Sequence, residues 1–129
     1  MSDFVGVEGL AKAITSAVQA YTEDVATAIK EEIDDTAKAI VAELKEVSPK
    51  DTGEYAKGWA ATKATKDGEY KQTVHNKKRP WLVHLLEFGH AKVGGGRVDG
   101  RPHLQPTYDK HATTFEAKVK KIIESGGKR

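Results

Sequence analysis

The stretch from Leu10 to Val47 contains neither glycine nor proline. Its apolar side chains recur at steps of three or four residues, which is the period of an amphipathic helix. They are Leu10, Ile14, Val18, Tyr21, Val25, Ile29, Ile33, Ala37, Ile40, Leu44 and Val47. Ser48 and Pro49 follow directly, and proline ends a helix because it lacks a backbone N–H and clashes with the preceding turn. We therefore expect one long N-terminal helix.

The length of this helix is itself informative. At about 1.5 Å per residue it would be roughly 57 Å long, whereas a compact domain of 129 residues has a diameter of only about 36 Å. A straight helix would therefore extend beyond its own domain. Either it breaks near Asp34, Asp35 and Thr36, whose short polar side chains can cap a new helix start, or other chains cover its overhanging apolar stripe.

The composition predicts one folded domain over residues 1–129. Hydrophobic residues make up 38% and charged residues 31%, which excludes a disordered polyelectrolyte. There is no cysteine, which excludes disulfides and thiol chemistry. The start MSDFVGVEG is acidic where a secretory signal is basic, and the apolar run WLVHLL is too short to cross a bilayer. We therefore expect no membrane partner.

The net charge of +2 conceals an asymmetry along the chain. Residues 1–50 hold five lysines and ten acidic residues, a balance of −5, which leaves sixteen basic and nine acidic residues, a balance of +7, for residues 51–129. Such polarity suits head-to-tail contacts between subunits as well as it suits nucleic acid.

The second half predicts a mixed α+β fold. Asp51–Gly53 is a turn, and Glu54–Trp59 is a short helix or the entry to a strand. The segments WAATKATK and EYKQTVHN flank Asp67-Gly68, a two-residue hairpin signal, with Tyr70 and Val74 facing inward. Trp81–Phe88 reads as a short helix in which five apolar side chains need cover, namely Trp81, Leu82, Leu85, Leu86 and Phe88.

Gly89 is expected to end this short helix in the left-handed conformation. A flexible glycine-rich loop follows over residues 91–100, and the helical period resumes at Leu104 with Pro106 in the first turn. The predicted class is thus α+β, with a long N-terminal and a C-terminal helix packed on a small antiparallel sheet with a central hairpin. Within the single domain we distinguish an acidic helical region (1–47), an α+β core (50–123) and a flexible tail (124–129).

The sequence gives little evidence of a catalytic, nucleotide-binding or metal site. The loop VGGGRVDGRP lacks the GK[ST] ending of a phosphate-binding loop and follows a helix instead of a strand. None of the five histidines forms a helical i, i+4 metal pair, although His75-Asn76 with His84 faintly suggests a nuclease. Glu87, in an apolar run, should pair with a cation such as Arg101 or accept backbone N–H bonds. We expect no catalytic residue, cofactor or metal.

One basic cluster could serve nucleic acid. Lys77, Lys78 and Arg79 place three positive charges beside Trp81, a candidate contact for a DNA backbone. A solvated turn at the end of the hairpin is the more common meaning of such a cluster.

Taken in order, several motifs resemble the tail-completion, or head–tail joining, proteins of long-tailed bacteriophages. After the long helix come TG with an aromatic nearby (Thr52, Gly53, Trp59), VHN (74–76), LLEFGH (85–90), a glycine-rich loop and RPHLQP (101–106). His103 departs from the pattern, where an aromatic residue is usual beside the proline.

The resemblance implies a non-enzymatic virion protein, made in the host cytoplasm, that forms a ring, commonly of six subunits, in the neck. Its partners would be the head connector or head-completion protein and the tail tube or tail-terminator protein, and DNA would pass through the ring without sequence-specific binding. Small ring formers also serve in head completion and tail termination, so this group of roles is implied. The residues expected at a subunit or tail-tube interface are Glu87, Phe88, Gly89, His90, Gly94, Gly95, Gly96, Arg97, Arg101 and Pro102.

The glycine-rich loop would then be disordered in the free subunit and fold against a neighbour or the tail tube. Two alternatives stay open. One is a nucleic-acid-binding or nuclease-like phage accessory protein that uses KKRPW (77–81) and the histidines. The other is a helical module of the toxin–antitoxin or chaperone kind that uses only residues 1–47.

Overall fold

The computed structural model describes residues 23–50, 53–66 and 68–129. Its elements are α2 (Glu23–Val47), α3 (Glu54–Lys57), β1 (Trp59–Lys66), β2 (Glu69–Asn76), α4 (Pro80–Phe88), β3 (Gly89–Ala91), β4 (Arg97–Asp99) and α5 (Leu104–Glu124). The predicted α+β class is confirmed. Residues 10–22 of the expected N-terminal helix, two residues of the predicted turn (51–52) and Asp67 lie outside the described residues.

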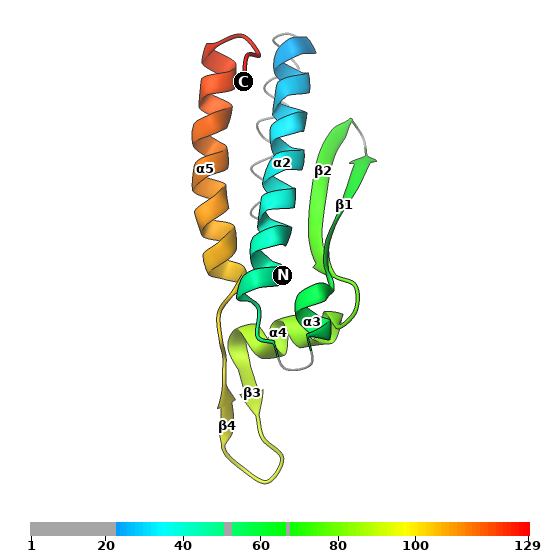
Figure 1. Ribbon diagram of the computed structural model, residues 1–129, viewed down its shortest axis with the longest axis vertical. Helices are drawn as coiled ribbons and strands as arrows, with labels where there is room; N and C mark the ends of the chain where they lie inside the picture. The colour runs from blue at the N-terminus through cyan, green and yellow to red at the C-terminus, as the bar shows by residue number, and fades with distance from the viewer. Residues whose placement is uncertain (1–22, 51–52, 67) are drawn as a thin grey trace.

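The elements are arranged lengthwise. Helix α2 runs along the middle, α5 lies along one side of it, and the β1–β2 hairpin lies along the other (Figure 1). Helices α3 and α4 lie near the C-terminal end of α2, and the β3–β4 hairpin projects beyond them (Figure 1). We call this projecting hairpin the arm. The chain therefore has one end built from α4 and the arm, and an opposite end where α5 finishes.

Helix α2 is continuous, so the predicted break near Asp34 is wrong. The Asp34 carboxylate instead accepts hydrogen bonds from the Tyr70 hydroxyl and from the Gln72 side-chain amide of β2, the latter at 2.7 Å. Burial raises the pKa of Asp34, but these two hydrogen bonds, together with the charges of Lys63 and Lys38, outweigh it and hold that pKa below its usual value. Burial, together with the hydrogen bond to Asp34, raises the pKa of Tyr70 to about 12. Asp34 thus fixes the hairpin to α2.

The apolar stripe of α2 is covered by elements of the same chain. Its N-terminal half packs against α5 in a cluster of Val25, Ala28, Ile29, Ile33, Phe115, Val119 and Ile122. Its C-terminal half joins a second cluster of Ala37, Ile40, Leu44, Tyr55, Trp59, Val74, Val83 and Leu104. Each fully buried aliphatic side chain contributes about 1.5–3 kcal/mol. Val47, the last residue of the stripe, is the exception within α2, because it is 48% exposed.

The β1–β2 hairpin confirms the predicted two-residue turn, since Lys66 pairs with Glu69. Val74 is buried and Tyr70 packs against the first cluster, so the inward face is also as predicted. The part of β1 over residues 62–66 is exposed throughout. The second half of β1 is therefore left uncovered, whereas the β2 residues opposite it are partly buried.

The segment predicted as a flexible loop is largely a hairpin. Gly89 pairs with Asp99 and Ala91 with Arg97, so only residues 92–96 form a turn. That turn is closed by a hydrogen bond from the Lys92 N–H to the Gly96 carbonyl at 3.0 Å. Three consecutive glycines, 94–96, have φ values of 88°, 111° and 81°, which side-chain-bearing residues rarely adopt. The glycine run is thus explained by the turn.

The last residues, predicted as a flexible tail, fold back onto α2 in the structure. The Gly127 N–H donates to the Ile122 carbonyl at 2.9 Å, and Arg129 forms ion pairs with Glu31, Glu32 and Asp35 of α2.

The charge asymmetry of the sequence is also largely matched inside the subunit. Acidic α2 lies beside basic α5, where Lys110 contacts Glu43 at 2.7 Å and Lys118 contacts Glu32 at 3.5 Å. Together with Arg129, these contacts engage much of the negative charge of α2. Head-to-tail contacts between subunits are therefore not required to neutralise it.

Candidate interaction surface

The base of the arm is organised around Glu87, which is only 2% exposed. Its carboxylate accepts hydrogen bonds from the backbone N–H groups of His103, Leu104 and Gln105, each at 2.9 Å. These N–H groups lie at the start of α5, where a helix leaves its first donors unpaired and favours a negative charge. The prediction that Glu87 accepts backbone N–H bonds is confirmed, and it acts as the cap of α5.

His103 continues this network into the core. Its Nδ1 lies 2.8 Å from the Arg101 carbonyl and 3.1 Å from the Glu87 carboxylate, and its Nε2 lies 2.7 Å from the Tyr55 hydroxyl. Because both neighbours of Nδ1 are acceptors, Nδ1 carries the proton, and in the neutral ring Nε2 accepts from Tyr55. Burial, reinforced by the charge of Glu87, raises the pKa of Tyr55. Tyr55 therefore remains a donor at neutral pH.

Trp59 links the same network to the end of α2. Its ring meets the rings of Tyr55 and His103 edge-on, with centroids 5.5 and 6.3 Å apart. Its Nε1–H donates to the Ser48 hydroxyl at 2.8 Å, and that hydroxyl donates to the Leu44 carbonyl. The predicted helix stop at Ser48 thus has a second role, because it satisfies a buried indole.

The turn before α4 is held by Asn76. Its side-chain oxygen accepts from the backbone N–H groups of Lys78 and Arg79, at 3.2 and 2.9 Å, and its amide nitrogen donates to the Tyr55 carbonyl at 2.8 Å. Gly58 allows this approach, since a Cβ there would lie 2.3 Å from the Asn76 oxygen. Asn76 therefore fixes the backbone at Lys78 and Arg79, two of the three basic residues of the candidate DNA contact.

Two glycines allow the arm to leave α4 at close range. Gly89 has a φ of 79° with an extended ψ of 179°, so the predicted positive φ is confirmed but the left-handed helical conformation is not. A Cβ on Gly89 would lie 2.3 Å from the Val98 carbonyl, and one on Gly100 would lie 2.6 Å from the Glu87 carbonyl. The Arg101 N–H then donates to the Leu86 carbonyl at 2.7 Å. The arm is thereby tied back to α4.

The outer side of this end is apolar and uncovered. Trp81 is 60% exposed and Phe88 is 49% exposed, so the cover that the sequence indicates for both is not supplied by the described part of the subunit. The buried residues of α4 are Val83 and Glu87 instead. On the arm, Val93 is fully exposed and Val98 is partly exposed.

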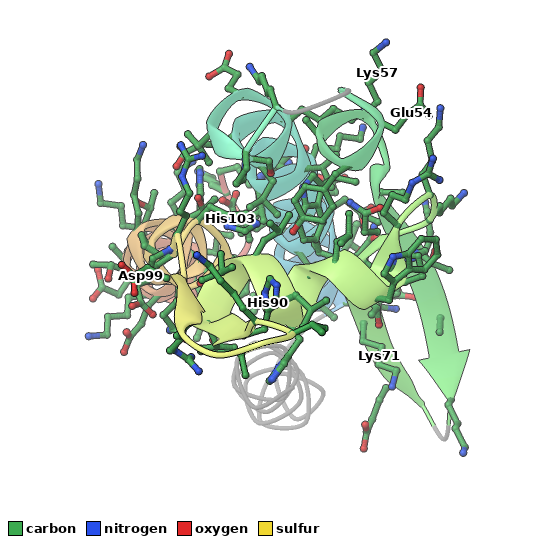
Figure 2. All side chains as sticks on the ribbon, turned by 90° about the horizontal axis from the view of Figure 1, so that it is seen from below. Glu54, Lys57, Lys71, His90, Asp99 and His103 are labelled. Atoms are coloured by element: carbon green, nitrogen blue, oxygen red, sulfur yellow. The ribbon has the colours of Figure 1, made fainter. Side chains whose placement is uncertain are left out.

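The predicted interface residues separate into two groups. Glu87 and Gly89 are buried inside the subunit, and His90 is half-buried. The others are exposed, namely Phe88, Gly94, Gly95, Gly96, Arg97, Arg101 and Pro102. Figure 2 looks onto this end, with the arm in front of α4 and with His90, Asp99 and His103 labelled.

Three residues that organise this end were not predictable in that role from the sequence, namely His103, Tyr55 and Asn76. The signal available for His103 was its place between Pro102 and the start of the C-terminal helix, where polar groups cap helix N-termini. Tyr55 and Asn76 had no local signal, because their partners lie 48 and 21 residues away.

The candidate DNA contact is partly occupied by the subunit. Lys78 pairs with Glu54 at 3.2 Å, and the Arg79 guanidinium lies 5.7 Å from the centre of the Trp81 ring. Lys77 and Lys78 are exposed, so contact with phosphate groups stays a hypothesis for these three residues.

The histidines are distributed over separate contacts. His75 bonds to Thr62, His84 packs on Phe88, and His111 lies 3.2 Å from Glu43. Within the described ranges, no group of three or more His, Asp or Glu side chains is placed to hold a metal ion.

A family model decides what kind of protein has this architecture. Residues 12–89, more than half of the chain, match the model of bacteriophage HK97-gp10-like proteins, which are described as tail components. The chain belongs to this bacteriophage family. A search of the curated proteins found no significant match, and neither did a search of the solved structures.

Membership in a phage tail-component family gives the protein a structural role in the virion. The match ends at Gly89, the first residue of the arm. The rest of the arm, the RPHLQP motif and α5 therefore lie outside it. None of the helices in the described part of the chain is long and apolar enough to cross a membrane.

Proposed function

We propose that this family member is a ring-forming neck protein that joins the head connector to the tail, the role called tail completion. The observation that carries the proposal is the match of residues 12–89 to a phage tail-component family. The motifs after residue 89 add support, because a glycine-rich segment followed by RPHLQP and a final helix resembles the order in head–tail joining proteins.

The exposed half of β1, residues 62–66, supports assembly into a ring. Both described sheets have only two strands, so each has open strand edges. Open strand edges are templates for another chain. A ring, commonly of six subunits, gives each exposed strand a neighbour without leaving free ends.

The proposed role needs no catalysis. Glu87 and His103, the buried acid–base pair, are bonded to the start of α5 and to Tyr55, which gives both a structural task. In the ring, Lys77, Lys78 and Arg79 would make mild, sequence-independent contacts with the phosphates of the passing DNA.

The test is electron microscopy of particles produced by a phage genome that lacks this gene. Filled heads beside separate finished tails are expected, and expression of the intact chain should restore joined particles. Reconstruction of the restored particles should then show a ring of this chain in the neck. Normal infectious particles without the gene would contradict the proposal and would favour the nucleic-acid-binding alternative.

A further inference from the structure

The end formed by α4 and the arm carries most of the uncovered apolar surface of the described residues. Four of the five large exposed hydrophobic residues lie there: Trp81 (60%), Phe88 (49%), Val93 (106%) and Val98 (38%). Trp81, His84 and Phe88 follow the i, i+3, i+7 spacing that places them on one face of α4. The rings of His84 and Phe88 are 5.0 Å apart. We call Trp81, His84, Phe88, Val93 and Val98 together the arm-end surface.

The same end carries nearly all of the surplus positive charge. Residues 77–103 hold six basic residues and two acidic ones, a formal charge of +4, and one of the two acids is the buried Glu87. The other described residues hold fourteen basic and thirteen acidic side chains, a formal charge of +1. The arm-end surface is therefore apolar in its middle and positively charged around it.

Two arginines are held at the ends of the aromatic stripe. The Arg79 guanidinium lies 5.7 Å from the centre of the Trp81 ring. At the other end, the Arg97 guanidinium donates to the Phe88 carbonyl at 2.6 Å. Tryptophan, phenylalanine and arginine are the residue types enriched in the cores of protein interfaces and among their energetic hot spots.

The charges also indicate which partner fits. A second copy of the described chain is a weaker match, because four of the eight acids of α2 are already paired with Lys110, Lys118 or Arg129. Duplex DNA would pair with the basic residues but would leave the apolar stripe without cover, since protein–DNA interfaces are highly polar.

We infer that the arm-end surface docks onto a different virion protein, one whose face has an apolar groove bordered by aspartate and glutamate. This inference rests on the proposed function, which places such a partner on the head or on the tail at their junction. Apolar contact supplies the affinity, and opposite charges supply orientation and rate.

The test uses heads and tails purified separately from cells infected with the phage lacking this gene. Full-length protein is mixed with each, and co-sedimentation measures binding. The variant Trp81→Ala/Phe88→Ala removes the apolar stripe, and Arg97→Glu reverses a charge at its end. Val47→Ala is the matched control, because Val47 is as exposed as Phe88 but lies at the end of α2. Unchanged urea unfolding midpoints show that the variants are folded.

The wild-type protein is expected to bind either heads or tails, more weakly at higher salt. The double variant should bind at least about tenfold more weakly, with Val47→Ala unaffected. Equal binding by all variants, or no binding of the wild-type protein to either particle, would overturn the inference. So would a change confined to self-association or to duplex DNA binding. If the wild-type protein and the double variant join heads to tails equally well, the inference is wrong and the joining function stands. If heads and tails join without the protein, the proposed function itself is wrong.

Discussion

The Glu87 carboxylate accepts a hydrogen bond from the backbone N–H of Leu104 at 2.9 Å, across 17 residues of sequence. This contact joins the last turn of α4 to the first turn of α5, and the whole arm lies between the two residues. The direction in which the arm projects is therefore set by one buried acid.

Replacement of Glu87 tests this arrangement. Glu87→Ala should destabilise the protein by about 2–4 kcal/mol, because it leaves buried N–H groups unpaired and removes the negative charge at the start of α5. Glu87→Gln keeps one acceptor oxygen and should cost less. Urea unfolding measures both. The control is Glu116→Gln, which changes an exposed acid on α5. It should change stability by less than about 0.5 kcal/mol. Equal effects at the two positions would exclude the cap.

The glycine at the start of the arm should tolerate no side chain. Gly89→Ala places a Cβ 2.3 Å from the Val98 carbonyl at a positive φ, so it should cost more than the roughly 1–3 kcal/mol of backbone strain alone. Gly94→Ala has the same sign of φ but meets nothing within 4 Å, and should cost about 1 kcal/mol. Urea unfolding of both variants makes the comparison, and a smaller loss at Gly89 would show that the two strands separate easily.

Removal of the Ser48 hydroxyl should leave the buried Trp59 Nε1–H without its acceptor. Ser48→Ala is therefore expected to lower the free energy of unfolding by about 1–3 kcal/mol. Thr113→Ala is the matched control, because its exposed hydroxyl bonds only to the preceding turn of α5. A thermal unfolding curve that is the same for both variants would argue against the Trp59–Ser48 bond.

The Asp34 contact predicts an acid-dependent part of the stability. The pKa of Asp34 is lower in the folded protein than its usual 3.8, so its contribution is complete above the unfolded pKa and is lost as the pH falls through the folded one. Asp34→Asn should therefore be less stable than the wild type at neutral pH, by about 1 kcal/mol because the site is half-exposed. The difference should shrink below about pH 4. A difference that stays constant with pH would contradict this account.

Local patterns sufficed for the elements themselves. The apolar period of α2, the Asp67-Gly68 turn, the start of α5 near Leu104 and the stop at Ser48 were all predictable, because each depends on neighbouring residues or on a period within one element. The resemblance to phage joining proteins was predictable for the same reason, since its motifs are short and contiguous.

Contacts between distant segments were not predictable in the same way. A break near Asp34 was one of the two predicted alternatives, but two residues of β2 bind this carboxylate and the helix continues. It predicted a loop after Ala91, where strand pairing instead forms the arm. It also indicated that Trp81 and Phe88 need cover but not where that cover comes from, and the choice of the buried face of α4 leaves both exposed in the described subunit.

The sequence by itself determined the helical periods, the turns and the uneven distribution of charge. Only the tertiary structure decided which faces are buried, where the acidic half meets the basic one, and that Glu87 caps a helix 17 residues later. The physical reason is that a buried charge or an apolar face is stabilised by whichever groups surround it in space. Those groups come from segments that the linear sequence does not bring together.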